Sequence, residues 1–403
     1  MKRLFGLVSI GLTFFLFIGS TLVIGAEKNI PPSIAKQLNE MRETGIKKGW
    51  TFEVGYSKSL EIPLENKTGL IVPRNWRHNA QFVQPVSYVE LPKKFDWRDY
   101  QGGGLTPIYN QGSCGSCWAF ATTAVFADLI WIRDRVKKDL AEQYLVSCNN
   151  YGYGCGGGWW VHDMYERFGM VPEASFPYEA EDVTCPANLP HQEKLESWSF
   201  VGSELDTYPT TEELKQAIYT YGPISVAVAA VGSFSAYSGG IFNDCSSSEI
   251  NHAVNLVGWN DDGGYWIMRN SWGADWGENG FMRIKYKCSS IGYAASFAAY
   301  KPSCTPQPKA DTGPDVTVKT GQSVKLGRPS SVSQTYSWSP TDGLDNPNIA
   351  QPSASPSNDT VYTLTAKTSC GKATNTVKVT VVSDDGGTDD DDDTDDDGTD
   401  DGK

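Results

Sequence analysis

A long apolar stretch in the middle of the chain predicts its central buried helix. Residues 118–135 (WAFATTAVFADLIWIRDR) are almost wholly hydrophobic over about five turns. Gly and Ser residues dominate the stretch before it, which is typical of a loop, so Cys117 falls in the first turn of the helix. The positive end of the helix dipole favours a thiolate there. Cys117 is therefore a candidate nucleophile, and a buried disulfide cysteine is the alternative.

Two later stretches have the pattern of paired strands. Residues 252–258 and 265–270 are apolar and rich in β-formers, and the turn-forming run 261–264 separates them. A hairpin of these strands would bring His252 beside Asn270. Residues 222–228 predict a further strand of the same sheet.

The part of the chain between residues 27 and 90 has a helical and then an extended pattern. Pro31-Pro32-Ser33 is typical of a helix start, and the apolar residues up to Ile46 fall largely on one helical face. The aromatic stretch 49–56 follows and reads as extended. A helix and a strand of this kind predict a plug for a substrate groove, and a disordered spacer is the alternative.

The first 26 residues predict an export signal. Lys2 and Arg3 precede an uncharged run from Leu4 to Ile24, and Gly25-Ala26 offers a small-residue cleavage site. The run is longer than the usual apolar core of about 7 to 15 residues, so an uncleaved membrane anchor is the alternative. No later stretch is apolar enough to span a bilayer.

After Tyr300 the composition changes to a Pro-rich linker followed by short alternating stretches. Five of these predict strands of a small antiparallel sandwich over residues 303–383: 316–318, 323–326, 336–338, 360–366 and 375–382. The run Tyr336-Ser337-Trp338-Ser339-Pro340 resembles immunoglobulin-like or polycystic-kidney-disease-type repeats. Residues 384–403 consist of Asp, Gly, Thr and a final Lys, and predict a disordered, solvating tail.

Charge and cysteine content narrow the function classes. The net charge is −14, and the tail supplies −11 of it through twelve Asp and one Lys, so the rest of the chain is nearly neutral. Nothing favours nucleic-acid binding, no cofactor or metal site is expected, and calcium binding by the tail lacks a complete loop motif. Nine cysteines favour a secreted protein, since one nucleophile leaves eight for disulfides.

The candidate nucleophile has the partners that thiol chemistry requires. Of the four histidines, His252 lies in an apolar strand pattern, whereas His78, His162 and His191 lie elsewhere. His252 follows Cys117 by 135 residues and Asn270 follows it by 153. With Cys114-Gly115-Ser116-Cys117-Trp118, this order resembles the papain-like cysteine peptidases over residues 91–300.

The resemblance implies an α+β fold with a helical left lobe and a β-barrel-like right lobe, the peptidase domain being residues 91–302. It implies that Cys117 and His252 face each other across a cleft, that Asn270 orients His252 and that Trp272 shields their bond. Gln111 would stabilise the oxyanion with the Cys117 N–H. The implied disulfides are Cys114–Cys155, Cys148–Cys185 and Cys245–Cys288. Cys304 and Cys370 then remain and would pair with each other.

The resemblance also implies how a peptide would bind. Gly157 and Gly158 would offer backbone hydrogen bonds. An apolar pocket for the residue second before the cut would be lined by Trp159, Trp160, Ala227 and Ala253, with Ser296 at its base. Packing of the left lobe is the alternative role of the two tryptophans. The thiolate pKa in the family pair is about 3 to 4.

Two function classes follow. The first is a secreted, monomeric cysteine endopeptidase, made with an inhibitory propeptide at 27–90, acting on proteins or peptides. No His-rich insertion of the kind that blocks the cleft in carboxy-end-trimming relatives lies between Tyr178 and Thr210. The second is a non-catalytic adhesion or carbohydrate-binding protein with a peptidase-like scaffold. The sandwich would hold a surface, a polymer or a protein.

Overall fold

The computed structural model describes residues 30–78, 80–85, 90–99, 104–205, 208–301, 308–329, 334–368 and 370–383 of the chain. The predicted export signal, Cys304 and the acidic tail lie outside these residues. Among the described helices, none has the length and apolar character needed to cross a membrane.

A helical lobe forms around the central apolar helix. It contains α3 (Cys117–Asp134), α4 (Glu142–Cys148), α5 (His162–Arg167) and the 3-10 turn Glu173–Ser175. Helix α3 is buried on all sides, as its continuous apolar sequence requires, and it ends at Arg135 in a left-handed conformation. Its side chains pack with those of α4 and α5 into one hydrophobic cluster, in which Trp118, Leu145 and Tyr165 are fully buried.

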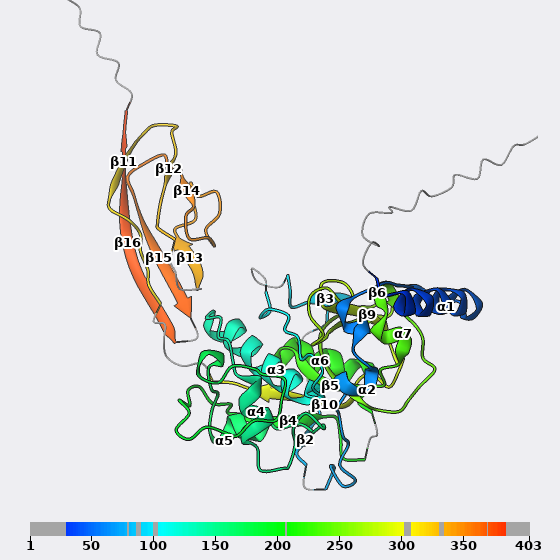
Figure 1. Cartoon of the computed structure of the whole chain (residues 1–403). Helices are drawn as coiled ribbons and strands as arrows, with labels where there is room; N and C mark the ends of the chain where they lie inside the picture. Colours follow the sequence, from blue (N-terminus) through cyan, green and yellow to red (C-terminus); the bar gives the residue numbers. More distant parts are fainter. Residues whose placement is uncertain are drawn as a thin grey trace, which may run out of the picture.

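A ten-stranded sheet forms the second lobe. Its order is β1-β6-β9-β8-β7-β5-β10-β4-β2, with β3 paired to β7. The strands are β1 (Phe52–Val54), β2 (Phe82–Val83), β3 (Lys94–Asp96), β4 (Ser197–Val201), β5 (Ile224–Val228), β6 (Tyr237–Phe242), β7 (His252–Asn260), β8 (Tyr265–Arg269), β9 (Phe281–Lys285) and β10 (Tyr293–Ala299). Helices α6 (Thr211–Tyr221) and α7 (Gly232–Ser235) pack on it, and Figure 1 shows α3 beside the sheet.

The predicted hairpin and central helix are both present and lie against each other. Strands β7 and β8 pair antiparallel, from Asn255 opposite Arg269 to Asn260 opposite Tyr265. The Asn255 side chain in β7 donates to the Ala121 carbonyl of α3 at 2.9 Å. Because α3 begins with Cys117 and β7 begins with His252, this packing brings the two ends together.

A buried ion pair also joins the two lobes. Arg269, the last residue of β8, donates to Asp128 of α3 at 2.8 Å, and both side chains are almost wholly buried. The other carboxylate oxygen of Asp128 accepts from the Thr106 N–H and hydroxyl. Asp128 therefore neutralises the buried charge of Arg269, the residue that directly precedes Asn270.

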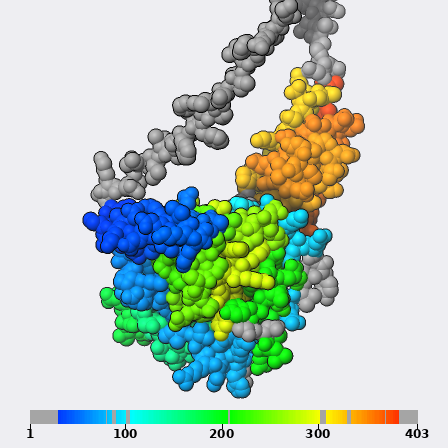
Figure 2. Space-filling view, turned by 90° about the vertical axis from the view of Figure 1, so that its right-hand side faces the viewer, coloured from blue at the N-terminus to red at the C-terminus, as the bar shows by residue number. Residues whose placement is uncertain are grey.

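The N-terminal segment, here residues 30–90, wraps around the two lobes. It contains α1 (Pro32–Lys48), β1, the 3-10 turn Lys58–Glu61, α2 (Leu64–Lys67) and β2. Strand β1 pairs with β6 and β2 pairs with β4, so this segment supplies both end strands of the large sheet. In Figure 2 the dark blue atoms that include α1 lie at the upper left of the part that holds the two lobes, next to green residues of the second lobe.

The part after residue 300 holds two further small sheets. Strands β11 (Val316–Lys319), β16 (Gly371–Val382), β15 (Thr360–Thr368) and β13 (Thr335–Ser339) form one in that order, and β12 (Val324–Lys325) and β14 (Ser353–Ala354) form the other. Their hydrophobic cluster includes Trp338, Tyr362 and Val379. The expectation that all pairs are antiparallel is wrong for β11 and β16, which run parallel. Along the chain, β11 is the first and β16 the last of the described strands after residue 300, so no hairpin turn connects them (Figure 1).

Candidate active site

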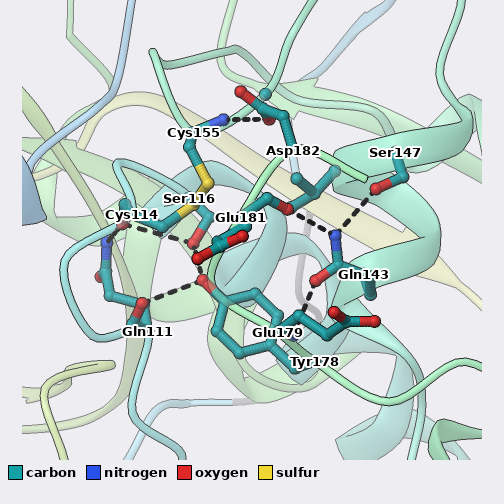
Figure 3. Close-up of a disulfide and its surroundings, with 12 residues drawn as sticks. Gln111, Cys114, Ser116, Gln143, Ser147, Cys155, Tyr178, Glu179, Glu181 and Asp182 are labelled. Atoms are coloured by element: carbon teal, nitrogen blue, oxygen red, sulfur yellow. Dashed lines mark hydrogen bonds between the residues drawn. A yellow bond between two sulfur atoms is a disulfide. The ribbon is translucent and has the colours of Figure 1, made fainter. Parts of the chain in front are cut away.

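The cysteine loop is held rigidly at the start of α3. Cys117 is the first residue of the helix and is fully buried. No side chain caps this helix end, so the first N–H groups remain directed at the region around the thiol. Tyr178 donates its hydroxyl proton to the Gln111 carbonyl at 2.9 Å, which leaves Ser116 as the donor in the 2.6 Å bond between their hydroxyls (Figure 3).

A disulfide ties this loop to the glycine-rich stretch that follows α4. Cys114 is bonded to Cys155, with the Cα atoms 4.5 Å apart. The Cys155 N–H donates to Asp182 at 2.7 Å (Figure 3), and the Gly115 N–H donates to the Cys155 carbonyl at 2.9 Å. The cysteine loop and residues 154–158 therefore form one unit. The structure also has the other two disulfides that the resemblance implies, Cys148–Cys185 and Cys245–Cys288.

The hairpin places His252 and Asn270 in direct contact. His252 Nε2 lies 2.8 Å from Asn270 Oδ1, which also accepts from the Ser271 N–H at 2.9 Å. Since Oδ1 only accepts, Nε2 carries the proton. The other ring nitrogen, Nδ1, is buried and has no hydrogen-bond partner among the described residues. The Trp272 ring stacks on the imidazole with 4.7 Å between centroids, so this bond is shielded from water.

Gln111 is fixed between the cysteine loop and the loop after β8. Its Oε1 accepts from the Ser271 hydroxyl at 2.7 Å, and its Nε2 donates to the Cys114 carbonyl at 2.8 Å. These two bonds determine which way the amide points, and they leave one Nε2 proton uncommitted. The residue is fully buried beside the nucleophile loop.

A short extended stretch of the N-terminal segment runs between these groups. The Gly69 carbonyl accepts from the Gly158 N–H at 2.9 Å, and the Ile71 N–H donates to the Gly158 carbonyl at 2.9 Å. Leu70 is thereby paired with Gly158 in parallel. Nearby, Trp272 donates to the Lys67 carbonyl at 3.2 Å. Residues 67–71 thus fill the region between Trp272 and the glycine-rich stretch.

The helix and aromatic strand that we expected to cover the cleft lie elsewhere. Strand β1 extends the far edge of the sheet beside β6, and α1 lies next to β6 and α7 at the periphery (Figure 1). Residues 67–71 cover the cleft instead, and no local pattern marks them. A Cβ atom on Gly69 would lie 1.9 Å from the Gly115 carbonyl oxygen, so only glycine fits there.

The expected apolar pocket residues share a hydrophobic cluster with a side chain of the same stretch. Leu70 is 4% exposed and belongs to one hydrophobic cluster with Trp159, Trp160, Ala227 and Ala253. Gly157 touches the stretch as well, since a Cβ there would meet Gly69 and Ile71. Ser296 is buried in β10 and its hydroxyl lies 3.2 Å from His162 Nε2. No local pattern marks this partnership of His162, because Ser296 is 134 residues away in the chain.

Burial keeps both reacting groups neutral in this state. Burial raises the pKa of the Cys117 thiol from 9.0 to about 11, against the effect of backbone hydrogen bonds with Ala253 and Gly69. Burial, together with the charge of Lys67, lowers the pKa of His252 to about 4, although the bond to Asn270 opposes this. The direction is opposite to that expected for an ion pair, because the folded chain removes both groups from water.

Together, the fold and this site define a class of protein: a two-lobed thiol hydrolase fold in which a cysteine at a helix start lies near a His–Asn pair. Residues 91–300, just over half of the chain, match the model described as "Papain family cysteine protease". The chain belongs to this family.

Similar proteins agree with this assignment. The chain is 37% identical over 254 residues to "Viral cathepsin" of Heliothis zea nuclear polyhedrosis virus, covering 60% of this chain and 66% of the relative. It is 35% identical over 272 residues to "Cathepsin L-like" of Caenorhabditis elegans, covering 62% and 77%. The chain thus spans just under two thirds of the viral relative.

A solved structure is similar over more than the family domain. It is the digestive procathepsin L2 proteinase from Tenebrio molitor larval midgut, with a TM-score of 0.58 and 27% identity. The match covers 66% of this chain and 90% of that chain. A share of this size exceeds what residues 91–300 alone provide.

Proposed function

We propose that this protein is the secreted precursor of a papain-like cysteine endopeptidase. Residues 1–26 would be the signal peptide, 27–90 the inhibitory propeptide and 91–302 the peptidase domain. Residues 303–383 would be an immunoglobulin-like sandwich and 384–403 a disordered tail. The observation that carries the proposal is the cleft itself: Cys117, the His252–Asn270 pair and Gln111 converge on a space that an extended stretch of the chain occupies.

Each residue has a defined step in this mechanism. Once the propeptide has left, water reaches the cleft and the Cys117 proton moves to His252 Nδ1, while Nε2–H stays with Asn270. The thiolate attacks the peptide carbonyl, and the oxyanion accepts from the free Gln111 Nε2–H and the Cys117 N–H. His252 then gives its Nδ1 proton to the leaving amine. Water, deprotonated by His252, hydrolyses the thioester and regenerates the thiol.

The position of Leu70 supports an apolar substrate pocket. Its side chain belongs to the same hydrophobic cluster as Trp159, Trp160, Ala227 and Ala253, and this cluster contains no charged side chain. A charged residue second before the cut would have to be buried unpaired, which costs several kcal/mol. We therefore expect a preference for apolar residues at that position.

The test is a Cys117→Ser variant of the full chain. Processed wild-type protein should cleave a peptide library and react with an epoxide-type thiol inhibitor, with the label on Cys117. The Ser variant should fold with the same thermal stability but lose both properties, because a hydroxyl ionises far less readily. Wild-type-like turnover by the variant would remove Cys117 from the mechanism. Absence of cleavage by both proteins would favour the adhesion alternative. The presence of all four proposed catalytic residues argues against that alternative.

A further inference from the structure

A second contact of the N-terminal segment lies outside the cleft and involves Trp76. Its ring packs against three aromatic residues of the family domain, with 4.6 Å to Phe200, 5.6 Å to Trp159 and 5.8 Å to Tyr293 between centroids. Its Nε1–H donates to the Tyr293 hydroxyl at 3.1 Å. We call these three residues the aromatic seat. The contact has both apolar area and a directed hydrogen bond, so it is selective for an indole.

Backbone pairing holds the same part of the segment on the sheet. Strand β2 runs parallel to β4, with Phe82 opposite Phe200. The Phe200 N–H donates to the Gln81 carbonyl at 2.8 Å, and the Gly202 N–H donates to the Val83 carbonyl at 2.9 Å. Removal of residues before 91 therefore frees both the aromatic seat and the edge of β4. A free sheet edge next to exposed aromatic rings is a surface that binds extended polypeptide.

The aromatic seat is continuous with the substrate pocket. Trp159 belongs to both, since it contacts Trp76 and lies in the same hydrophobic cluster as Leu70. Its ring is 5.3 Å from that of Trp160. A groove of about 690 Å³ runs beside this contact, and Trp159 and Phe200 of the family domain line it together with Trp76 of the N-terminal segment. Removal of the segment therefore widens this groove.

We infer that the processed enzyme uses the aromatic seat to bind an aromatic side chain, preferably Trp, of its polypeptide substrate. This inference rests on the proposed function. The segment leads from Gly69 beside Cys117, through Leu70 in the pocket, to Trp76. Since the pocket takes the residue second before the cut, the aromatic seat lies further along the amino-terminal side of the substrate. It would discriminate among long substrates and leave short peptides unaffected.

The test uses processed full-length enzyme and two kinds of substrate. A short peptide with an apolar residue second before the cut reports the basal reaction. A series of long peptides then carries one Trp, moved a residue at a time along the amino-terminal side, on an otherwise identical polar sequence. At one position or two adjacent positions the KM should fall about tenfold relative to an Ala version, with kcat unchanged.

Two variants identify the surface responsible, each scored as a ratio of two substrates on the same enzyme. Phe200→Ala should abolish the advantage of the best Trp peptide over its Ala version. Tyr293→Phe should keep an advantage for aromatic residues but remove the preference of Trp over Phe, because only the hydroxyl is lost. A structural role for either residue would change all substrates equally and leave these ratios intact.

Direct binding gives an independent measurement. A peptide of residues 72–83 should bind the processed, thiol-blocked enzyme at least about tenfold more tightly than its Trp76→Ala version. Cleavage of the short peptide with no Trp effect at any position, and equal binding of these two peptides, would overturn the inference and leave the proposed function intact. Failure to cleave even the short peptide would instead overturn the proposed function.

Discussion

At the scale of single residues, the groups that we propose for catalysis are oriented but uncharged in this structure. His252 Nε2 is bonded to Asn270, and Gln111 has an uncommitted amide proton, so both side chains have the orientation that the proposed mechanism needs. Their charge states do not match it, because burial raises the thiol pKa to about 11 and lowers that of His252 to about 4. The raised pKa of the Cys117 thiol disfavours the thiolate at neutral pH. Displacing residues 67–71 is therefore an electrostatic as well as a steric step.

Lys67 contributes to this suppression from the segment itself. The residue is 1% exposed, and its ammonium group lies 4.6 Å from the centre of the Trp272 ring, whose other contacts include His252. No acidic side chain pairs with it among the described ion pairs. Burial lowers its pKa from 10.5 to about 8.

This shift predicts a pH dependence of segment binding. Because the lowered pKa favours neutral Lys67 in the bound state, binding is strongest above pH 10.5, weakens as the pH falls to 8 and changes no further below that value. The affinity of a peptide of residues 30–90 for processed Cys117→Ser enzyme is the measurement. Relative to a Lys67→Met peptide, the wild-type peptide should gain on the order of 50-fold between pH 7.5 and 10. Parallel pH profiles for the two peptides would contradict this.

At the scale of elements, the segment has three anchors: β1 on one sheet edge, β2 on the other, and residues 67–71 between them. Only the middle one touches the reacting groups. The pairing of β1 and β2 with the sheet fixes the chain on both sides of residues 67–71 and so holds this stretch in place.

Gly69→Ala should therefore weaken latency without affecting the mature enzyme. The new methyl group would overlap the Gly115 carbonyl oxygen, and two backbones cannot separate without lifting the stretch from the cleft. The uncleaved variant precursor should hydrolyse a short peptide about tenfold faster than the wild-type precursor, measured as the initial rate while gels show no processing.

Gly49→Asn is the matched control in the same segment. Gly49 ends α1 in a left-handed conformation that Asn tolerates, and nothing lies within 4 Å of its added Cβ. Its initial rate should stay at the wild-type level. Equal rates for all three precursors would show that Gly69 is not essential for closure.

The contact between α3 and β8 gives a further prediction. Asp128→Ala leaves the Arg269 guanidinium buried without a carboxylate, and removing one partner of such a pair costs about 3 to 5 kcal/mol. Thermal unfolding of the inhibitor-blocked enzyme should show this loss. The double variant Asp128→Ala/Arg269→Met should recover most of it, because no unpaired charge remains. A single variant as stable as wild type would mean that water enters and solvates Arg269.

Local signals explain which elements were predicted and which were not. The α3 helix and the β7–β8 hairpin depend on residues near in sequence, so their apolar patterns and the Asp261–Gly264 turn were sufficient. The place of Gly69 depends on Gly115, far along the chain, and β14 contains two residues only. Interactions that form only between distant segments leave no periodic pattern in the sequence.

The same distinction between local and long-range signals applies to the proposed site. A short motif and a strand pattern mark Cys117, His252, Asn270 and Gln111 as candidates, and they remain the proposed catalytic residues. No such pattern indicates the charge state of Cys117 and His252, because that state depends on how deeply the fold buries them. The path of the segment likewise depends on which sheet edges are free, and both edges appear only in the folded protein.

At the scale of the whole molecule, the proposed catalytic site and the C-terminal sheets lie in different parts of the chain. Every residue proposed for catalysis or the pocket lies between Gln111 and Ser296. The described residues after 307 have their own hydrophobic cluster, in which Trp338 is 1% exposed and donates to the Ile349 carbonyl at 3.0 Å. A part with its own core is expected to fold by itself and to hold a surface, a polymer or a partner rather than to build the cleft.

A truncation after Lys301 tests this division of labour. The shortened, processed enzyme should turn over a short peptide within about twofold of the full-length rate, per active site titrated with the thiol inhibitor. Trp338→Ala in the full chain is the complementary variant: loss of this buried side chain costs about 3 to 5 kcal/mol, enough to unfold a small sheet pair, yet turnover should not change. If both changes lower turnover per active site tenfold or more while the peptidase part stays folded, the C-terminal sheets support the cleft, and the two-part arrangement must be abandoned. If only the truncation does so, the linker after residue 300, rather than the sheets, is what the cleft requires.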